Sequence, residues 1–132
     1  MIKFPLNAVA LAVALFLVDP VVAAESIEIK YIPIGMHTYQ AIDTAGIDNL
    51  YFQIGHLEKG SERYNQLMSL LDNPSEGSFN DWTVRVKISS PGSPDIFIDN
   101  DGGMRTAKGD YALSDEQIEA LKAFLESTTE KR

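Results

Sequence analysis

The residues best suited to acid–base or metal chemistry are the two histidines, His37 and His56, and a carboxylate close to the second of them. His56 and Glu58 are separated by one residue, so on an extended segment both side chains lie on one face. An imidazole beside a carboxylate can orient a general base or supply two metal ligands. Two ligands are too few for a metal site, and the HExxH pattern is absent. The alternative is a loop histidine beside a surface glutamate.

The segment 99–103, Asp-Asn-Asp-Gly-Gly, invites a calcium interpretation. A calcium-binding EF-hand loop needs oxygen ligands at positions 1, 3 and 5, glycine at 6 and glutamate at 12. Placing Gly102 at position 6 puts Phe97 at position 1 and Lys108 at position 12, so the motif fails at both ends. Aspartate and asparagine followed by two glycines are typical of a tight hairpin turn. We therefore predict a structural turn and no metal site.

Several classes of chemistry are excluded by residues that the sequence lacks. With no cysteine, there are no cysteine nucleophiles, redox dithiols, thiolate zinc sites or iron–sulfur clusters. The serine motifs Gly-x-Ser-x-Gly and Ser-x-x-Lys are absent, as are glycine-rich phosphate loops. Arg85 and Lys87 form a small basic spot on one side of a predicted strand, which hints at a binding face. The alternative there is an ordinary solvated strand face.

The first 24 residues have the pattern of a cleavable secretory signal peptide. Lys3 supplies a positive start, and the segment 8–18 is an unbroken run of eleven apolar residues, shorter than the roughly 18 that a membrane span needs. Pro20 ends any helix, and the Val-Ala-Ala sequence before Glu25 suits a signal peptidase. We expect residues 1–24 to be removed and the protein to reach the periplasm or the cell exterior. The alternative is an uncleaved interfacial anchor.

The remaining segment 25–132 has the length of one domain. Removing Asp19 from the 19 acidic residues and Lys3 from the 11 basic residues leaves 18 and 10, so the net charge stays at −8. That charge argues against binding to nucleic acid or to an anionic membrane. It is compatible with a basic protein partner or a cation, or simply with solubility. Because disulfides are impossible, the domain must be stabilised by its core alone.

The first half of the domain is predicted to form three strands and a helix. Apolar and charged residues alternate over 26–34, the period of a half-buried strand, and Pro33 either ends that strand or places it at a sheet edge. The other predicted elements are strands at 38–42 and 47–54, a turn at 43–46 between them, and a helix capped by Ser61. The apolar face of that helix consists of Tyr64, Leu67, Met68 and Leu71.

The second half, after a polar connector at 74–81, is predicted to form three strands and a longer helix. Its clearest strand places Trp82, Val84, Val86 and Ile88 on one face and Thr83, Arg85 and Lys87 on the other. Shorter strands are expected at 95–99 and 104–112. Ser114 and Gln117 form the capping box of the final helix. The buried stripe of that helix is predicted to be Ile118, Leu121 and Leu125.

These patterns predict an α+β domain with an antiparallel sheet of about six short strands and two helices on one face. The two halves share an Ile-Asp-x-x-Gly turn and the same predicted order of elements. One interpretation is therefore a duplicated βββα unit with half-repeats at 27–73 and 82–126. The alternative is an α+β sandwich whose halves share only the order of their elements.

We predict from these observations a small exported binding protein without catalytic activity, an inhibitor or immunity-type partner of another protein in the bacterial periplasm. The residues predicted to bind are Arg85, Lys87, His56 and Glu58, and no catalytic residue, metal or cofactor is predicted. The alternative is a small hydrolase or metal-dependent enzyme that uses His56, Glu58 and the turn of Asp99 and Asp101. A cleft that gathers these residues would favour the enzyme, and an exposed apolar patch would favour the binder.

Overall fold

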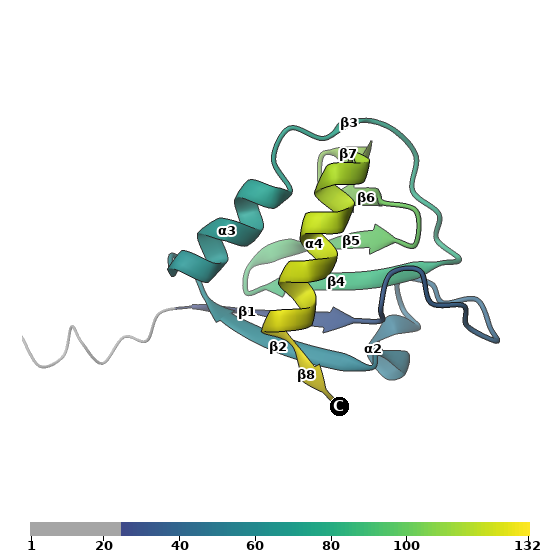
Figure 1. Cartoon of the computed structure of the whole chain (residues 1–132), viewed down its shortest axis with the longest axis horizontal. Coiled ribbons are helices and arrows are strands. Elements are labelled where there is room, and N and C mark those ends of the chain that lie inside the picture. The colour runs from purple at the N-terminus through teal and green to yellow at the C-terminus, as the bar shows by residue number, and fades with distance from the viewer. Residues whose placement is uncertain (1–24) are drawn as a thin grey trace, which may run out of the picture.

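The computed structural model describes residues 25–132; the predicted signal peptide, residues 1–24, lies outside the described residues. The domain is α+β, as predicted, with one antiparallel sheet and three helices (Figure 1). The sheet has eight strands where about six were predicted. The strands are β1 (Ser26–Tyr31), β2 (Gln53–Glu58), β3 (Ser75–Glu76), β4 (Val84–Ser90), β5 (Ser93–Asp99), β6 (Gly103–Thr106), β7 (Gly109–Ala112) and β8 (Glu130–Lys131). The helices are α2 (Ile47–Leu50), α3 (Glu62–Leu70) and α4 (Asp115–Thr128).

The strands lie in the order β3-β7-β6-β5-β4-β1-β2-β8, so β1 is in the interior of the sheet. Of the two outcomes predicted from Pro33, the first is correct: β1 ends at Tyr31, before the proline. The second, a position at the sheet edge, is wrong. Strands β4 to β7 form a meander of consecutive antiparallel pairs. The β1–β4 pair, with Ile29 opposite Ile88, then joins this meander to β2.

Helices α3 and α4 pack on the same face of the sheet over the main core (Figure 1). Both begin as predicted: the Ser61 hydroxyl accepts the N–H of Tyr64 at 3.2 Å, and Ser114 and Gln117 make a reciprocal capping box. Within residues 25–132, no helix has the length and apolar character that crossing a membrane requires. The main core consists of Ile27, Ile29, Tyr31, Ile34, Leu57, Leu67, Leu71, Val86, Ile88, Ile98, Met104, Leu113, Leu121, Phe124 and Leu125.

A β-bulge in β4 divides that strand between the two faces of the sheet. The register shifts between Val84 and Val86, which leaves Arg85 as the extra residue. Val86 belongs to the main core, whereas Val84 packs in a second core on the other face. The prediction that one face carries the whole alternating row is therefore wrong for Val84 and for Trp82, whose side chain is 70% exposed. The second core consists of Ile32, Ile42, Ile47 and Val84.

The segment between β1 and β2 differs most from the prediction. Residues 38–42 form no strand, although Ile42 makes an isolated bridge to Thr83. Ile47–Leu50, predicted as part of a strand, forms the short helix α2 instead. The Asp43 carboxylate accepts the N–H of Gly46 at 2.6 Å and the Asp43 carbonyl accepts the N–H of Ile47 at 3.2 Å, so the predicted turn continues into a helical turn. The strand then begins at Gln53.

The two predicted half-repeats do not run through the same elements. Residues 27–73 contain β1, α2, β2 and α3, whereas 82–126 contain β4, β5, β6, β7 and most of α4. The connector 74–81 contributes the two-residue strand β3, which pairs with β7. The similarity of the halves is therefore confined to turn residues and helix periodicity.

Candidate functional site

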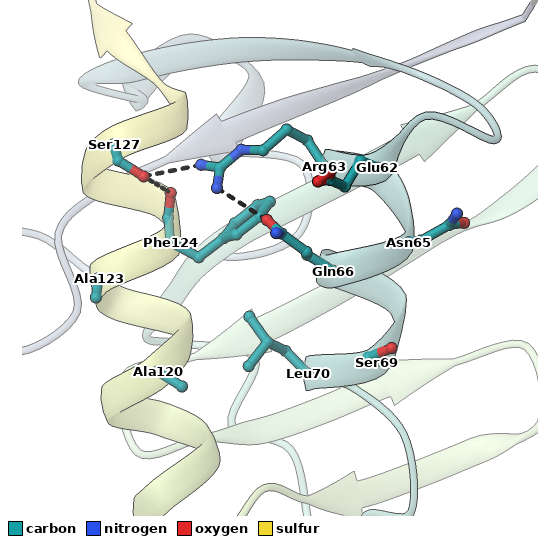
Figure 2. Close-up of a pocket in the computed structure, with 10 residues that line it drawn as sticks. All are labelled: Glu62, Arg63, Asn65, Gln66, Ser69, Leu70, Ala120, Ala123, Phe124 and Ser127. Atoms are coloured by element: carbon teal, nitrogen blue, oxygen red, sulfur yellow. Dashed lines mark hydrogen bonds between the residues drawn. The ribbon is translucent and has the colours of Figure 1, made fainter.

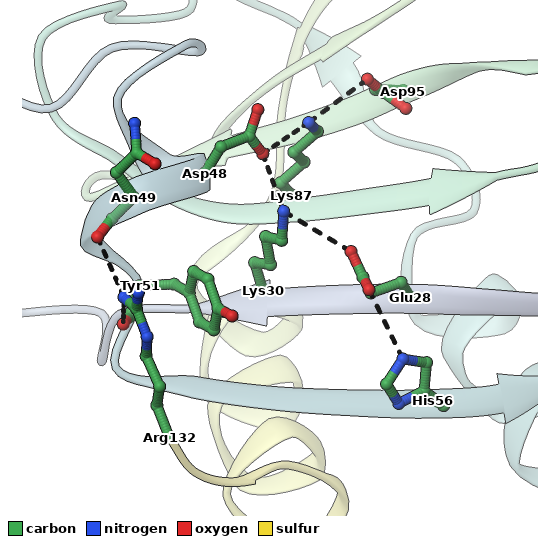
Figure 3. Close-up of polar contacts among 9 residues, drawn as sticks. All are labelled: Glu28, Lys30, Asp48, Asn49, Tyr51, His56, Lys87, Asp95 and Arg132. Carbon is green, nitrogen blue, oxygen red and sulfur yellow. Dashed lines mark hydrogen bonds and ion pairs between the residues drawn. The ribbon is translucent and has the colours of Figure 1, made fainter.

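The sheet face opposite α3 and α4 carries an ion cluster that includes one of the predicted binding residues, Lys87. Lys30 of β1 and Lys87 of β4 are direct cross-strand neighbours, an arrangement that is unfavourable for two like charges. Asp48, carried by α2, resolves this conflict: one of its oxygens lies 3.0 Å from Lys30 Nζ and 2.7 Å from Lys87 Nζ (Figure 3). The buried Ile47 anchors helix α2 on this face of the sheet. The helix thereby holds Asp48 in place as the counter-ion of the two lysines.

The electrostatics of the cluster favour fully charged groups. The hydrogen bond from Lys87, opposed by burial and assisted by Lys30, holds the pKa of Asp48 below its usual value. Burial lowers the pKa of Lys30, but the hydrogen bond and charge of Asp48, together with Glu28, outweigh it and leave that pKa raised. Glu28 lies 3.6 Å from Lys30, and Asp95 lies 3.8 Å from Lys87. With the pKa of Asp48 lowered and that of Lys30 raised, both groups stay charged at neutral pH. They therefore suit a structural role better than proton transfer.

His56 joins the edge of this cluster through a partner that the sequence did not indicate. Its Nε2 lies 3.5 Å from a carboxylate oxygen of Glu28, its cross-strand neighbour on β1 (Figure 3). Glu58 lies two residues further along β2, on the same face, opposite Ser26. The imidazole and the Glu28 carboxylate are therefore brought together by sheet register and not by the His56-x-Glu58 spacing.

The turn after β5 uses its aspartate to organise the backbone. Asp99 is only 2% exposed. One of its oxygens accepts the N–H groups of Asp101 and Gly103, both at 2.8 Å, and the other accepts the N–H of Asn80 at 2.7 Å. A Cβ at Gly103 would collide with this carboxylate and with the Ser78 carbonyl, which explains the glycine. The Asp99 carboxylate thus has backbone donors on both oxygens.

The residues of the alternative enzyme site lie far apart. Ile98, Val86, Tyr31 and Gln53 stand in one cross-strand row. Asp99 is one residue beyond that row in one direction and His56 three residues beyond it in the other, which is about 13 Å along the strands. Three strand spacings add about 14 Å across the sheet. Among the described residues, no group of three or more histidines and carboxylates could hold a metal ion.

Arg85 does not share an outward face with Lys87, which corrects the predicted basic spot. The bulge turns its side chain into the structure, where it is 3% exposed. Its guanidinium donates to the Val84 carbonyl at 3.1 Å and to the Met36 carbonyl at 2.8 Å, and its Nε has no partner. Burial lowers its pKa, against the opposing charges of Asp101 and Asp99. Arg85 therefore ties the loop after β1 to the bulge.

Three large apolar side chains among the described residues are exposed, and all belong to the end of the domain where α2, the loop after β1 and the start of β4 meet (Figure 1). Tyr39 is fully exposed, Trp82 is 70% exposed and Phe52 is 46% exposed. Tyr39 and Phe52 line one hollow of about 230 Å³, which Ile42 also lines. The Ile42 N–H donates to the Trp82 carbonyl at 2.8 Å, so the backbone of the third aromatic residue lies next to this hollow while its side chain lines a different one. We call Tyr39, Phe52 and Trp82 the aromatic end.

The aromatic end was missed in the sequence because its residues resembled strand residues. Trp82 fitted the alternation of β4, and Tyr39 and Phe52 fell in predicted strands. The one available signal was Tyr39 itself, an aromatic residue among polar neighbours. Trp82 also lines a hollow of about 730 Å³ together with Asp81, Asp99 and Asp101, so the aromatic end borders negative charge.

No protein-family model, curated protein or solved structure matches this chain.

Proposed function

We propose that this chain is a small exported binding protein without catalytic activity, and that its partner is another protein, in the manner of an inhibitor or immunity protein of the bacterial periplasm. The observation that carries the proposal is the aromatic end. Tyrosine and tryptophan are the residue types most often found as binding hot spots. A domain that has no cysteine for disulfides would gain stability by burying these side chains, so their exposure points to a surface kept for binding.

The charge near the aromatic end indicates a basic partner. Asp81 and Asp101 border Trp82, and the whole chain carries a net charge of −8. Complementary charge speeds association and excludes acidic competitors. We therefore expect a partner that presents an apolar patch surrounded by lysine and arginine.

The alternative, a hydrolase or metal-dependent enzyme, has less support. His56 is separated from Asp99 by three strand spacings. The carboxylate of Asp99 is engaged by backbone donors on both oxygens. Such an enzyme would need these groups in one cleft.

The binding proposal is tested by affinity capture from a periplasmic extract, followed by mass spectrometry. The bait is compared with a double variant, Tyr39→Ser with Trp82→Ser. The control is Lys108→Ser, in the β6–β7 turn at the other end of the sheet. A partner retained by the wild type and the control but lost with the double variant supports the proposal. A partner retained equally by all three, or no specific partner, contradicts it.

Export is tested separately by N-terminal sequencing of material secreted into the periplasm or medium. We expect the mature protein to begin at Glu25, because the small residues before it suit a signal peptidase. Exported material that begins at Met1 would contradict the proposed cleavage.

A further inference from the structure

Helices α3 and α4 lie side by side with a groove of about 890 Å³ between them (Figure 2). The apolar side chains that line it are Leu70, Ala120, Ala123 and Phe124. Ala120 and Ala123 are exposed, one helical turn apart on α4. Their small side chains leave room for the backbone of another segment to approach closely.

The groove is held open by a polar clamp at each end. At one end, Arg63 of α3 donates to the Ser127 hydroxyl at 2.8 Å and stacks over the Phe124 ring, 4.3 Å from its centroid. At the other end, Gln117 of α4 donates to the carbonyl of Leu70 at 3.1 Å. Because both clamps join one helix to the other, the separation of the helices is fixed before any ligand arrives. The clamps are ten residues apart on α4, or about 15 Å.

The rim of the groove is acidic. Glu62 lines it on the α3 side, and on α4 the exposed Glu116 and Glu119 lie about one helical turn before Ala120 and Ala123, next to the same face. Of the basic residues on these helices, Arg63 is engaged in its clamp and Lys122 lies 3.5 Å from Glu119. The rim therefore complements basic groups.

We propose that the α3/α4 groove binds a short amphipathic helix of a partner protein, with its apolar stripe on Leu70, Ala120 and Ala123 and with lysine or arginine on both flanks. Helix-in-groove recognition uses anchors at i, i+3, i+4 and i+7, and a groove of about 15 Å matches about ten helical residues. This surface is separate from the aromatic end, so the inference goes beyond the proposed function and does not depend on it.

The test uses a defined probe, a fluorescent peptide of about 14 residues with leucine at helical spacing and lysine elsewhere. Fluorescence anisotropy measures its binding to the purified protein at about 0.15 M salt, where long-range charge effects are screened. Ala123→Arg, which fills the groove, should weaken binding about tenfold or more. Ala107→Arg, an exposed alanine in the β6–β7 turn, adds the same charge elsewhere and should leave binding unchanged. A peptide with glutamate in place of lysine should not bind.

Equal weakening by Ala123→Arg and Ala107→Arg would overturn the inference, because it would mean that net charge alone attracts the peptide. Absence of binding by the wild type would overturn it as well. So would a dimer that Ala123→Arg dissociates without peptide, because the occupant would then be a second copy of the chain. Circular dichroism checks the folding of each variant, and Ala120→Arg replaces Ala123→Arg if the latter does not fold. The Tyr39→Ser, Trp82→Ser variant should still bind the peptide, which separates this result from the test of the aromatic end.

Discussion

Replacing Leu121 with alanine tests whether α4 is the helix that covers the main core. Leu121 is fully buried near the middle of α4, in the same cluster as Val86 of the sheet and Leu67 of α3. Truncation of a buried leucine costs about 2–5 kcal/mol, and the cost is greater where the surroundings cannot collapse into the cavity. Because the sheet lies below Leu121 and α3 beside it, we expect about 3–4 kcal/mol, out of about 5–15 kcal/mol for a whole domain.

Glu119→Ala is the matched control, two residues away on the same helix. Its side chain is exposed and lies 3.5 Å from Lys122, so we expect a change of about 0.5 kcal/mol or less. Urea unfolding followed by far-ultraviolet circular dichroism measures both variants. With a slope of about 1–3 kcal/mol per molar urea, Leu121→Ala should lower the midpoint by roughly 1–4 M. Trp82 fluorescence is a poor probe, since the side chain is already 70% exposed. Equal midpoints for the two variants would refute the assignment of this helix face to the core.

Three further predictions concern titration and the turn after β5. Burial raises the pKa of Tyr31 from 10.0 to about 12, so the stability that this residue contributes is complete below about pH 10 and is lost as the pH rises to 12. An ultraviolet absorbance titration should show a step near pH 12 that Tyr31→Phe removes, and an unchanged curve would contradict this. The lowered pKa of Asp48 means that its contribution is present above about pH 4 and is lost as the pH falls further. Asp48→Asn should therefore destabilise the protein by about 0.2–1 kcal/mol at pH 7, with a gap that narrows as the pH falls below about 4; a constant gap in acid unfolding would argue against it. Because Asp99 already accepts three backbone N–H groups, calorimetry should detect no calcium binding tighter than about 10⁻⁴ M. Asp101→Ala should leave the calcium titration unchanged. Tighter binding would show the turn to be a cation site.

The parts of the fold that were predicted correctly depend on contacts between near neighbours in the chain. The capping box of Ser114 and Gln117 closes within one helical turn, so local sequence determines it. The alternation of Ile27, Ile29 and Tyr31 identified the buried face of β1 in the same way. Neither pattern, however, could predict where β1 lies in the sheet, because that position depends on pairing with β4, which is more than fifty residues away in the sequence.

The bulge and α2 could not be inferred from local patterns. Val84 and Val86 are both apolar, so a regular alternation and a bulge at Arg85 fit the sequence equally well. In Ile47–Leu50 only Ile47 and Leu50 suit a strand, and the hydrogen bonds that Asp43 accepts from Gly46 and Ile47 form a helical turn there instead. Tertiary packing of Ile47 in the second core outweighs the local preference.

The candidate site was only partly accessible from the sequence. His56 and Lys87 were singled out, but their partners Glu28 and Asp48 come from other elements. Register pairs Lys30 with Lys87, and only that pairing explains why a carboxylate is needed between them. The aromatic end is likewise created by the meeting of three segments and has no signature within any one of them.

The β1–β4 seam also has a consequence for the order in which the domain folds. Short turns connect the consecutive strands of the meander from β4 to β7. Forming each of these strand pairs therefore costs little loop-closure entropy. Tyr31 and Val86, by contrast, must find each other across an intervening loop that contains α2, β2 and α3. Folding rates fall as contacts become less local, so we expect the pairing of β1 with β4 to be slower than the pairing within the meander. Until that step is complete, the inner edge of β4 is an unpaired strand able to pair with other chains, so we expect the same seam to govern susceptibility to aggregation during folding.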